Sequence, residues 1–226
     1  MIKSFLILII FPIFLFSSQQ IILVIADDFN TTHATLELHE DNRTIFSTSV
    51  NIGKNGLAWG LGEISLTQKK GEPLKYEGDN RAPAGIFKLS NIFGYANESN
   101  FKMPYLHTSQ TLICVDDSNS PFYNQIITQN GDEKSFEYMK RKDKQYELGI
   151  VVMHNKNAIK RRGSCIFLHV QREENAPTAG CTSMKLHDIQ RVVNWIDKDK
   201  NPILIQIPKS SAHEVAKLYP SLKNSL

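Results

Sequence analysis

The sequence is poor in cysteine and in net charge, and each shortage excludes a class of protein. Three cysteines among 226 residues are too few for a disulfide-dense scaffold or a four-cysteine zinc ribbon. The 26 lysines and arginines nearly balance the 23 aspartates and glutamates, and the resulting net charge of +3 is too small for binding that depends on phosphates. Hydrophobic residues make up 41% and charged residues 22%, which predicts a folded chain. We therefore expect a globular protein with no nucleic-acid partner.

One long apolar run lies at the N-terminus. Lys3 precedes the apolar residues 5–16, and the small polar residues Ser17 and Ser18 follow. This order is typical of a secretory signal peptide, so we predict that residues 1–18 are cleaved. Residues 5–16 would rise about 18 Å as a helix, short of the ~30 Å hydrocarbon core, although an uncleaved membrane anchor and a buried helix remain alternatives. We expect the protein to be secreted, in the periplasm or cell envelope, and to contact the membrane only if this segment stays uncleaved.

Residues 19–226 are predicted to form a single domain, because no repeat, low-complexity tract or Pro/Ser-rich linker divides them. A hairpin is indicated by the segments Ala34–Glu40 and Thr44–Val50, which the turn residues Asp41 and Asn42 separate. Further strands are expected at Ile21–Ala26, Gly85–Leu89, Leu112–Val115, Leu148–Met153, Cys165–Val170 and Ile203–Ile207.

Few segments have helical periodicity. The best one covers Met184–Asp197, with Ser183 as a candidate N-cap and Pro202 beyond its end. Its expected buried face consists of Leu186, Ile189, Val193 and Ile196. A second, shorter candidate is Ser211–Leu218. The predicted fold class is mostly β (α+β), with one or two packed helices.

The strongest signal for chemistry is a histidine followed by a cysteine. His169 ends an apolar strand, and Cys181 follows a small-residue turn just before the predicted helix. The loop between them is long enough to return the thiol beside the imidazole, where a positive charge and the helix N-terminus would favour the thiolate. Gly180 permits close backbone approach, so N–H groups around Cys181 could face a developing oxyanion. The alternative is a buried structural cysteine, the commoner fate of this residue type.

The segment FLHVQREENAPTAGC, which contains both residues, resembles the catalytic core of the L,D-transpeptidase (YkuD-type) family. That family has a histidine, a variable loop and then Ser/Thr-x-Gly-Cys, which is Thr178-Ala179-Gly180-Cys181 here. Residues 77–87, EGDNRAPAGIF, resemble its Gly-Asp … Thr-Pro-x-Gly-x-Phe pattern at the substrate cleft. Residues 115–117, 122–124 and 162–164 resemble a less studied branch, so the likeness extends from about Ile21 to Pro208.

The resemblance implies an L,D-transpeptidase-like β-sandwich and a cysteine acyltransferase that acts on peptidoglycan stem peptides. Cys181 would attack the carbonyl of the bond between an L-centre and D-alanine. His169 would take the thiol proton or sit as the imidazolium of an ion pair, oriented by a main-chain carbonyl for which Val170 is the positional match. The thioester would then react with an amine, a protein lysine or water. No cofactor and no metal ion is implied.

Three further residues are candidates for substrate binding: Thr178, Tyr123 and Arg162. A buried hydrogen-bonding role is the alternative for Tyr123, and a solvated turn is the alternative for Arg162. Better-known members of the family have a second histidine where Ala179 stands, and often asparagine or arginine where Ser183 stands, so the choice of acceptor is open. An L,D-carboxypeptidase would use the same residues, and a catalytically silent wall-binding module would keep the cleft without the reaction.

The other two cysteines, Cys114 and Cys165, could pair in an oxidising compartment and leave Cys181 free. They could equally be two buried strand thiols. We favour the buried thiols, because nothing in the sequence fixes the distance between their Cα atoms.

Overall fold

The computed structural model describes residues 19–226, so the predicted signal peptide lies outside the described part of the chain. Strands make up 36% of the structure and helices 12%, which confirms the predicted fold class. The strands, in chain order, are β1 (Ile21–Ala26), β2 (His33–Glu40), β3 (Arg43–Asn51), β4 (Leu57–Trp59), β5 (Ala82–Gly94), β6 (Tyr105–His107), β7 (Leu112–Val115), β8 (Ile126–Thr128), β9 (Phe136–Tyr138), β10 (Leu148–Val152), β11 (Phe167–Val170), β12 (Thr182–Met184) and β13 (Ile203–Pro208). The helices are α1 (Leu186–Trp195), α2 (Ala212–Leu218) and three short 3-10 segments at Lys198–Lys200, Lys209–Ser211 and Pro220–Leu222. Within residues 19–226, no helix has the length and apolar character needed to cross a membrane.

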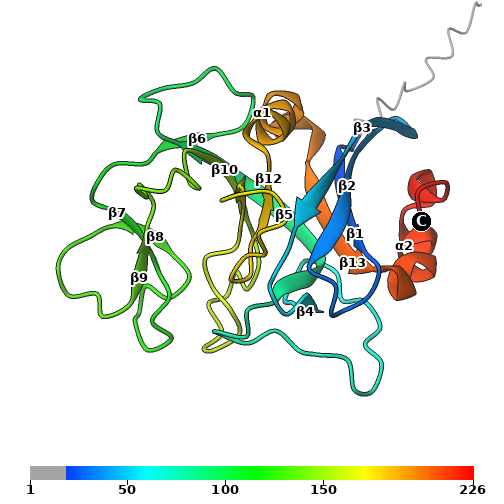
Figure 1. Ribbon diagram of the computed structural model, residues 1–226, viewed down its shortest axis with the longest axis horizontal. Coiled ribbons are helices and arrows are strands. Elements are labelled where there is room, and N and C mark those ends of the chain that lie inside the picture. Colours follow the sequence, from blue (N-terminus) through cyan, green and yellow to red (C-terminus); the bar gives the residue numbers. More distant parts are fainter. Residues whose placement is uncertain (1–18) are drawn as a thin grey trace, which may run out of the picture.

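The main sheet closes on itself. Its strands follow the order β10-β11-β12-β3-β2-β1-β13-β5-β4, and β10, at one end of this path, also pairs with β5, the strand before the other end. Figure 1 shows α1 lying across one end of the sheet and α2 lying beside β1 and β13. The main hydrophobic core fills the inside of the sheet and the space under the helices, with buried side chains that include Leu23, Leu36, Ile86, Val192 and Leu204.

The predicted hairpin is formed by β2 and β3. Asp41 and Asn42 have φ values of 51° and 61°, the left-handed pair of conformations that a tight two-residue hairpin turn requires. The other predicted strands are all found, but β11 begins two residues later than expected. It does so because Cys165 has φ 53°, a conformation that a strand does not adopt.

The helix that follows Cys181 also begins later than the sequence pattern predicts. Ser183, the predicted N-cap, lies in β12, which pairs in parallel with β11, and α1 starts only at Leu186. Leu186 is 38% exposed, so the predicted helix face is wrong at this position. The second predicted helix is confirmed as α2.

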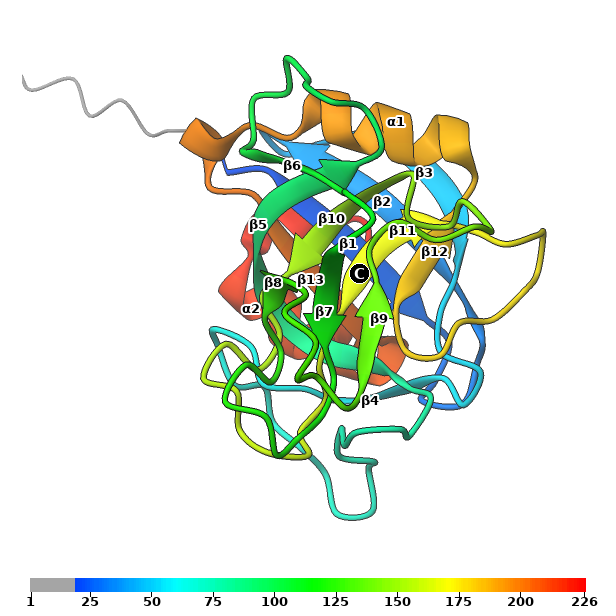
Figure 2. The same cartoon turned by 90° about the vertical axis from the view of Figure 1, so that its left-hand side faces the viewer.

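A smaller sheet, with strand order β8-β7-β9, packs on one side of the main sheet. Figure 2 views the molecule from this side, with β11 and β12 beside the smaller sheet. A disulfide joins Cys114 of β7 to Cys165, just before β11, with the two Cα atoms 6.0 Å apart. The favoured prediction of two buried thiols is therefore wrong, because packing of the smaller sheet against the segment before β11 brings these residues together from positions 51 apart in the chain.

Candidate active site

Strands β11 and β12 bring the predicted histidine and cysteine together. The two strands are parallel, with His169 opposite Ser183, and Cys181 immediately precedes β12. Side chains alternate along a strand, so Phe167 and His169 project from the same face of β11. The Phe167 amide donates a hydrogen bond to Sγ of Cys181 at 3.3 Å, which ties the thiol to that strand. His169 and Cys181 therefore face the same space.

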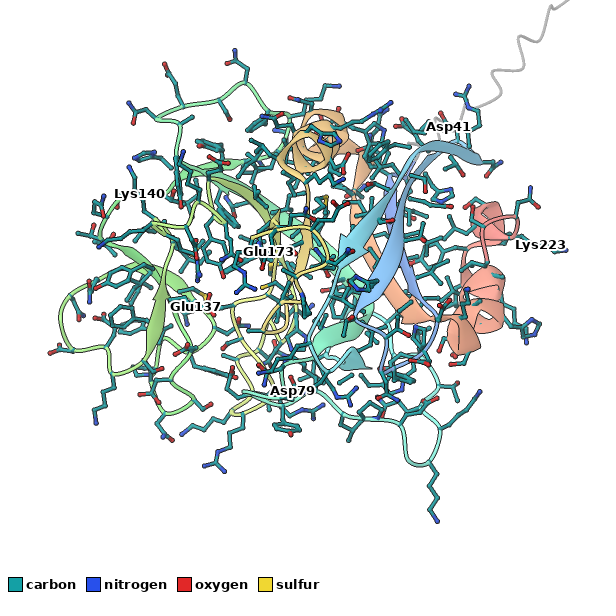
Figure 3. The ribbon with its side chains drawn as sticks, in the orientation of Figure 1. Asp41, Asp79, Glu137, Lys140, Glu173 and Lys223 are labelled. Carbon is teal, nitrogen blue, oxygen red and sulfur yellow. A yellow bond between two sulfur atoms is a disulfide. The ribbon has the colours of Figure 1, made fainter. Side chains whose placement is uncertain are left out.

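That space is a cavity of about 370 Å³ between the two sheets and the loop that carries Cys181. His169, Cys181, Thr178 and Gly180 all line it. Its charged lining residues are Lys75, Glu77, Glu137, Arg141 and Arg172. Figure 3 shows Glu137 on the side of the smaller sheet. A cavity of this size that carries both charge signs suits a peptide with carboxylates and an amine.

The protonation state of His169 follows from one hydrogen bond. Its Nδ1 lies 2.8 Å from the carbonyl oxygen of Val170. A carbonyl oxygen only accepts, so Nδ1 carries the proton and Nε2 is left as a proton acceptor. Burial lowers the pKa of His169 to about 4, although the bond to Val170 works in the opposite direction. The predicted role of the Val170 carbonyl in orienting the imidazole agrees with this geometry.

The surroundings of Cys181 favour the thiol rather than the predicted thiolate. Its side chain is buried, and Sγ lies 3.5 Å from the carbonyl oxygen of Cys165, to which it donates. Burial first, and the charge of Glu137 second, raise the pKa of Cys181 to about 12. The expected helix N-terminus lies beyond β12, so its dipole does not assist at this position. At neutral pH the pair is a neutral thiol and a neutral imidazole.

The turn before the cysteine is held by Thr178. Its Oγ1 donates to the carbonyl oxygen of Cys181 at 2.6 Å and accepts from the Gly180 amide at 3.0 Å. Gly180 has φ 150°, and a Cβ at this position would lie 3.1 Å from the carbonyl oxygen of Arg81. Glycine is therefore required here, as predicted, but its N–H already donates to Thr178 and does not point to an oxyanion in this state.

Tyr123 and Arg162, the two other predicted substrate-binding residues, do not line the cavity. Tyr123 is buried and donates its hydroxyl proton to Glu77, and burial raises its pKa. Arg162 donates from Nε to the carbonyl oxygen of Lys75 at 3.0 Å. Both contact residues of the wall, so they position Glu77 and Lys75 rather than reach the cavity themselves.

Several lining residues were missed by the sequence reasoning. Tyr146 stacks edge-on against His169, with ring centroids 5.3 Å apart, and its hydroxyl donates to Glu137 at 2.6 Å. The guanidinium of Arg141 lies 5.0 Å from the centroid of the Tyr146 ring. These residues come from β9 and the loop that follows it, and no motif in that segment marks them.

No group of three or more His, Cys, Asp or Glu side chains among residues 19–226 is arranged to hold a metal ion. A family model described as the L,D-transpeptidase catalytic domain (YkuD) matches residues 22–205. The matched segment contains His169, Cys181 and the loop that includes Lys75, so it covers the whole cavity described above. No curated protein and no solved structure gives a significant match to the chain.

Proposed function

Since the chain belongs to the L,D-transpeptidase catalytic domain family, whose activity is directed at peptidoglycan, we propose that it is a cysteine acyltransferase for stem peptides. Cys181 is the proposed nucleophile and His169 the proposed general base. One observation carries the assignment: the bond from Nδ1 of His169 to Val170 leaves Nε2 unprotonated on the cavity that Cys181 shares. A base in this state is what a neutral buried thiol needs.

The proposed reaction starts from the neutral pair. As Sγ of Cys181 attacks the carbonyl carbon next to D-alanine, its proton passes to Nε2 of His169 and the carbonyl π electrons move to oxygen. The tetrahedral intermediate collapses when the C–N bond breaks, and the imidazolium returns the proton to the leaving amine of D-alanine. The product is a thioester on Cys181. An amine, a protein lysine or water then attacks the thioester carbonyl carbon while His169 accepts the proton of that acceptor. The C–S bond breaks, and the imidazolium returns the proton to Sγ of Cys181.

We propose that residues 1–18 are a cleaved signal peptide, that residues 19–226 act as one catalytic domain, and that the protein works outside the cytoplasm. The disulfide between Cys114 and Cys165 supports this location, because disulfides persist mainly in oxidising compartments. Cys181 is the free cysteine of the described chain, so a nucleophilic thiol coexists with the disulfide.

The test uses purified residues 19–226 and a Cys181→Ala variant with a disaccharide-tetrapeptide, analysed by liquid chromatography–mass spectrometry. Loss of D-alanine with cross-linked dimers, and an acyl adduct on Cys181, is the expected result. Loss of D-alanine without dimers, even with added amine, would make the protein an L,D-carboxypeptidase. Unchanged substrate with the folded wild type, together with binding that persists in Cys181→Ala, would replace the catalytic proposal with a wall-binding module.

A further inference from the structure

A buried ion pair stands in the wall of the cavity. Nζ of Lys75 lies 2.6 Å from Oδ1 of Asp79, and the two side chains are 4% and 1% exposed. The carboxylate of Asp79 also accepts from the amides of Tyr76 and Arg81, at 3.0 and 2.9 Å. The loop is thus folded around this carboxylate, which holds the ammonium in one place.

The ammonium of Lys75 is close to the turn that carries the nucleophile. It lines the same cavity as Cys181 and His169, and it lies 3.7 Å from the point where a Cβ on Gly180 would stand. An ammonium has three donors, and Lys75 uses two of them, on Asp79 and on the carbonyl oxygen of Tyr76 at 3.2 Å. Among the described residues, no acceptor is assigned to the third N–H, which leaves it for an atom in the cavity.

The proposed reaction places negative charge in this same region. When Cys181 attacks, the substrate carbonyl oxygen becomes an oxyanion, and fixed donors or cations in a dry site stabilise such a charge far better than water does. The Gly180 amide already donates to Thr178. The Gly180 amide, which the sequence predicted as an oxyanion donor, is therefore already used. The buried ammonium of Lys75 in the cavity wall beside it can stabilise that charge instead.

We propose that Lys75 is a catalytic residue whose ammonium stabilises the oxyanion formed when Cys181 attacks the stem peptide. Asp79 is then a positioning residue, because a buried lysine without a partner tends to lose its proton. This inference rests on the proposed acyl transfer. It adds to that proposal an electrostatic group that neither the His169–Cys181 pair nor the glycine turn provides.

A direct test must remove the charge without leaving Asp79 unpaired. Lys75→Met alone would bury a lone carboxylate, which can unfold the protein, so the informative variant is the double substitution Lys75→Met/Asp79→Asn. The matched control is Lys156→Met/Glu63→Gln, which removes an ion pair of 2.9 Å outside the cavity. Thermal unfolding of all three proteins establishes that they are folded.

We expect kcat for D-alanine release to fall on the order of 100-fold in the Lys75→Met/Asp79→Asn variant, with KM changed by less than about threefold. Lys75→Arg, which keeps the charge, should recover part of the rate. A folded double variant with the wild-type kcat would overturn the proposal, and so would a loss confined to KM, which would assign Lys75 to anchoring a substrate carboxylate. The control variant should match the wild type.

A second measurement separates this proposal from the proposed function. The rate at which iodoacetamide alkylates Cys181 depends on the stability of the thiolate and not on any peptide substrate. The ionisable groups that line the cavity with the thiol are Lys75, Glu77, Glu137, Arg141, Tyr146, His169 and Arg172. Of these, Glu137, Lys75 and Arg141 act on the charge of the thiol. Removing the Lys75 charge should slow alkylation several-fold even if the wild type releases no D-alanine. An unchanged rate would overturn the role of Lys75 even in a protein that releases D-alanine. Slower alkylation in a protein that is inactive towards the tetrapeptide would instead overturn the acyl transfer, and with it the oxyanion role, while showing that the Lys75 charge acts on Sγ of Cys181.

Discussion

The main-chain carbonyl oxygen of Cys165 lies 3.5 Å from Sγ of Cys181, so a disulfide half-cystine forms part of the environment of the free thiol. Cys165 has φ 53°, a conformation that costs free energy for a residue with a side chain. The disulfide to Cys114 and a bond from the Cys165 amide to Oδ1 of Asn124, at 2.9 Å, both hold it there. The geometry around the nucleophile therefore depends on the attachment of the smaller sheet.

Replacing both half-cystines, in Cys114→Ala/Cys165→Ala, is expected to destabilise the protein by roughly 2–4 kcal/mol, because the bond closes a long loop in the unfolded chain. Activity should fall as well, because the carbonyl oxygen of residue 165 would no longer be fixed against Cys181. Urea unfolding with and without a reductant measures the first effect, and D-alanine release measures the second. The double variant should be insensitive to reductant. Equal stability of the oxidised and reduced wild type would contradict this expectation.

Gly180→Ala should disable the site because the new Cβ would lie 3.1 Å from the carbonyl oxygen of Arg81 in a backbone conformation that alanine rarely adopts. We expect a loss of stability of about 1–3 kcal/mol and at least a tenfold drop in kcat. Gly71→Ala is the matched control, since Gly71 also has positive φ, 91°, but no atom lies within 4 Å of the added Cβ. A Gly180→Ala protein that behaves like Gly71→Ala would show that close approach to Arg81 is unimportant.

The sequence predicted the elements of the fold better than it predicted the electrostatics of the site. Apolar runs and the turn residues Asp41 and Asn42 are local signals, and the strands they indicate are present. The sequence motif also predicted that the loop after His169 returns Cys181 to it, and the two residues do line one cavity. The short strand β12 was missed, because Thr182–Met184 is a strand only through its pairing with β11, and the helix dipole was invoked wrongly as a result.

The sequence did not predict that His169 and Cys181 are both neutral, nor that the smaller sheet packs against Cys181. Burial of Cys181 depends on residues from β5, β7 and the loop after β9 that contains Met139 and Tyr146, which are distant in the chain. The same is true of the disulfide, whose two cysteines are 51 positions apart. Long-range packing therefore determines the protonation states, while local patterns determine the strands.

Stability should fall in acid because two buried histidines are neutral in the folded protein. Burial lowers the pKa of His154 and of His169 to about 4 in each case, whereas an unfolded histidine has a pKa near 6.5. Between these values the unfolded chain binds more protons, so the stability that is complete above about pH 6.5 is lost as the pH falls towards 4. Urea unfolding at pH 7.5, 6, 5 and 4.5 should show this decline.

The carboxyl of Glu137 opposes the effect of the histidines on the pH dependence of stability. Burial raises its pKa, so it stabilises the folded protein as the pH falls. A raised folded pKa favours the folded state at low pH, and that contribution disappears as the pH rises. Glu137→Gln should therefore steepen the acid loss of stability that the histidines cause. A flat stability between pH 7.5 and 4.5 in this variant would contradict the assignment of neutral buried histidines.

Glu137→Gln should also make Cys181 more reactive. The carboxylate raises the pKa of the thiol, second only to burial, and it accepts a hydrogen bond from Tyr146 that a glutamine oxygen can also accept. Removing the negative charge should lower the thiol pKa, and one unit of that shift would raise the thiolate fraction about tenfold at a pH well below it. Alkylation of Cys181 by iodoacetamide is therefore expected to be faster in the variant.

The difference in alkylation rate between Glu137→Gln and the wild type should grow with pH as Glu137 ionises in the wild type. Glu133→Gln, a half-buried position on the loop between β8 and β9 that does not line the cavity, serves as the control and should alkylate at the wild-type rate. If Glu137→Gln and Glu133→Gln react alike at every pH, the smaller sheet does not act on the thiol through charge, and burial alone accounts for its neutral state.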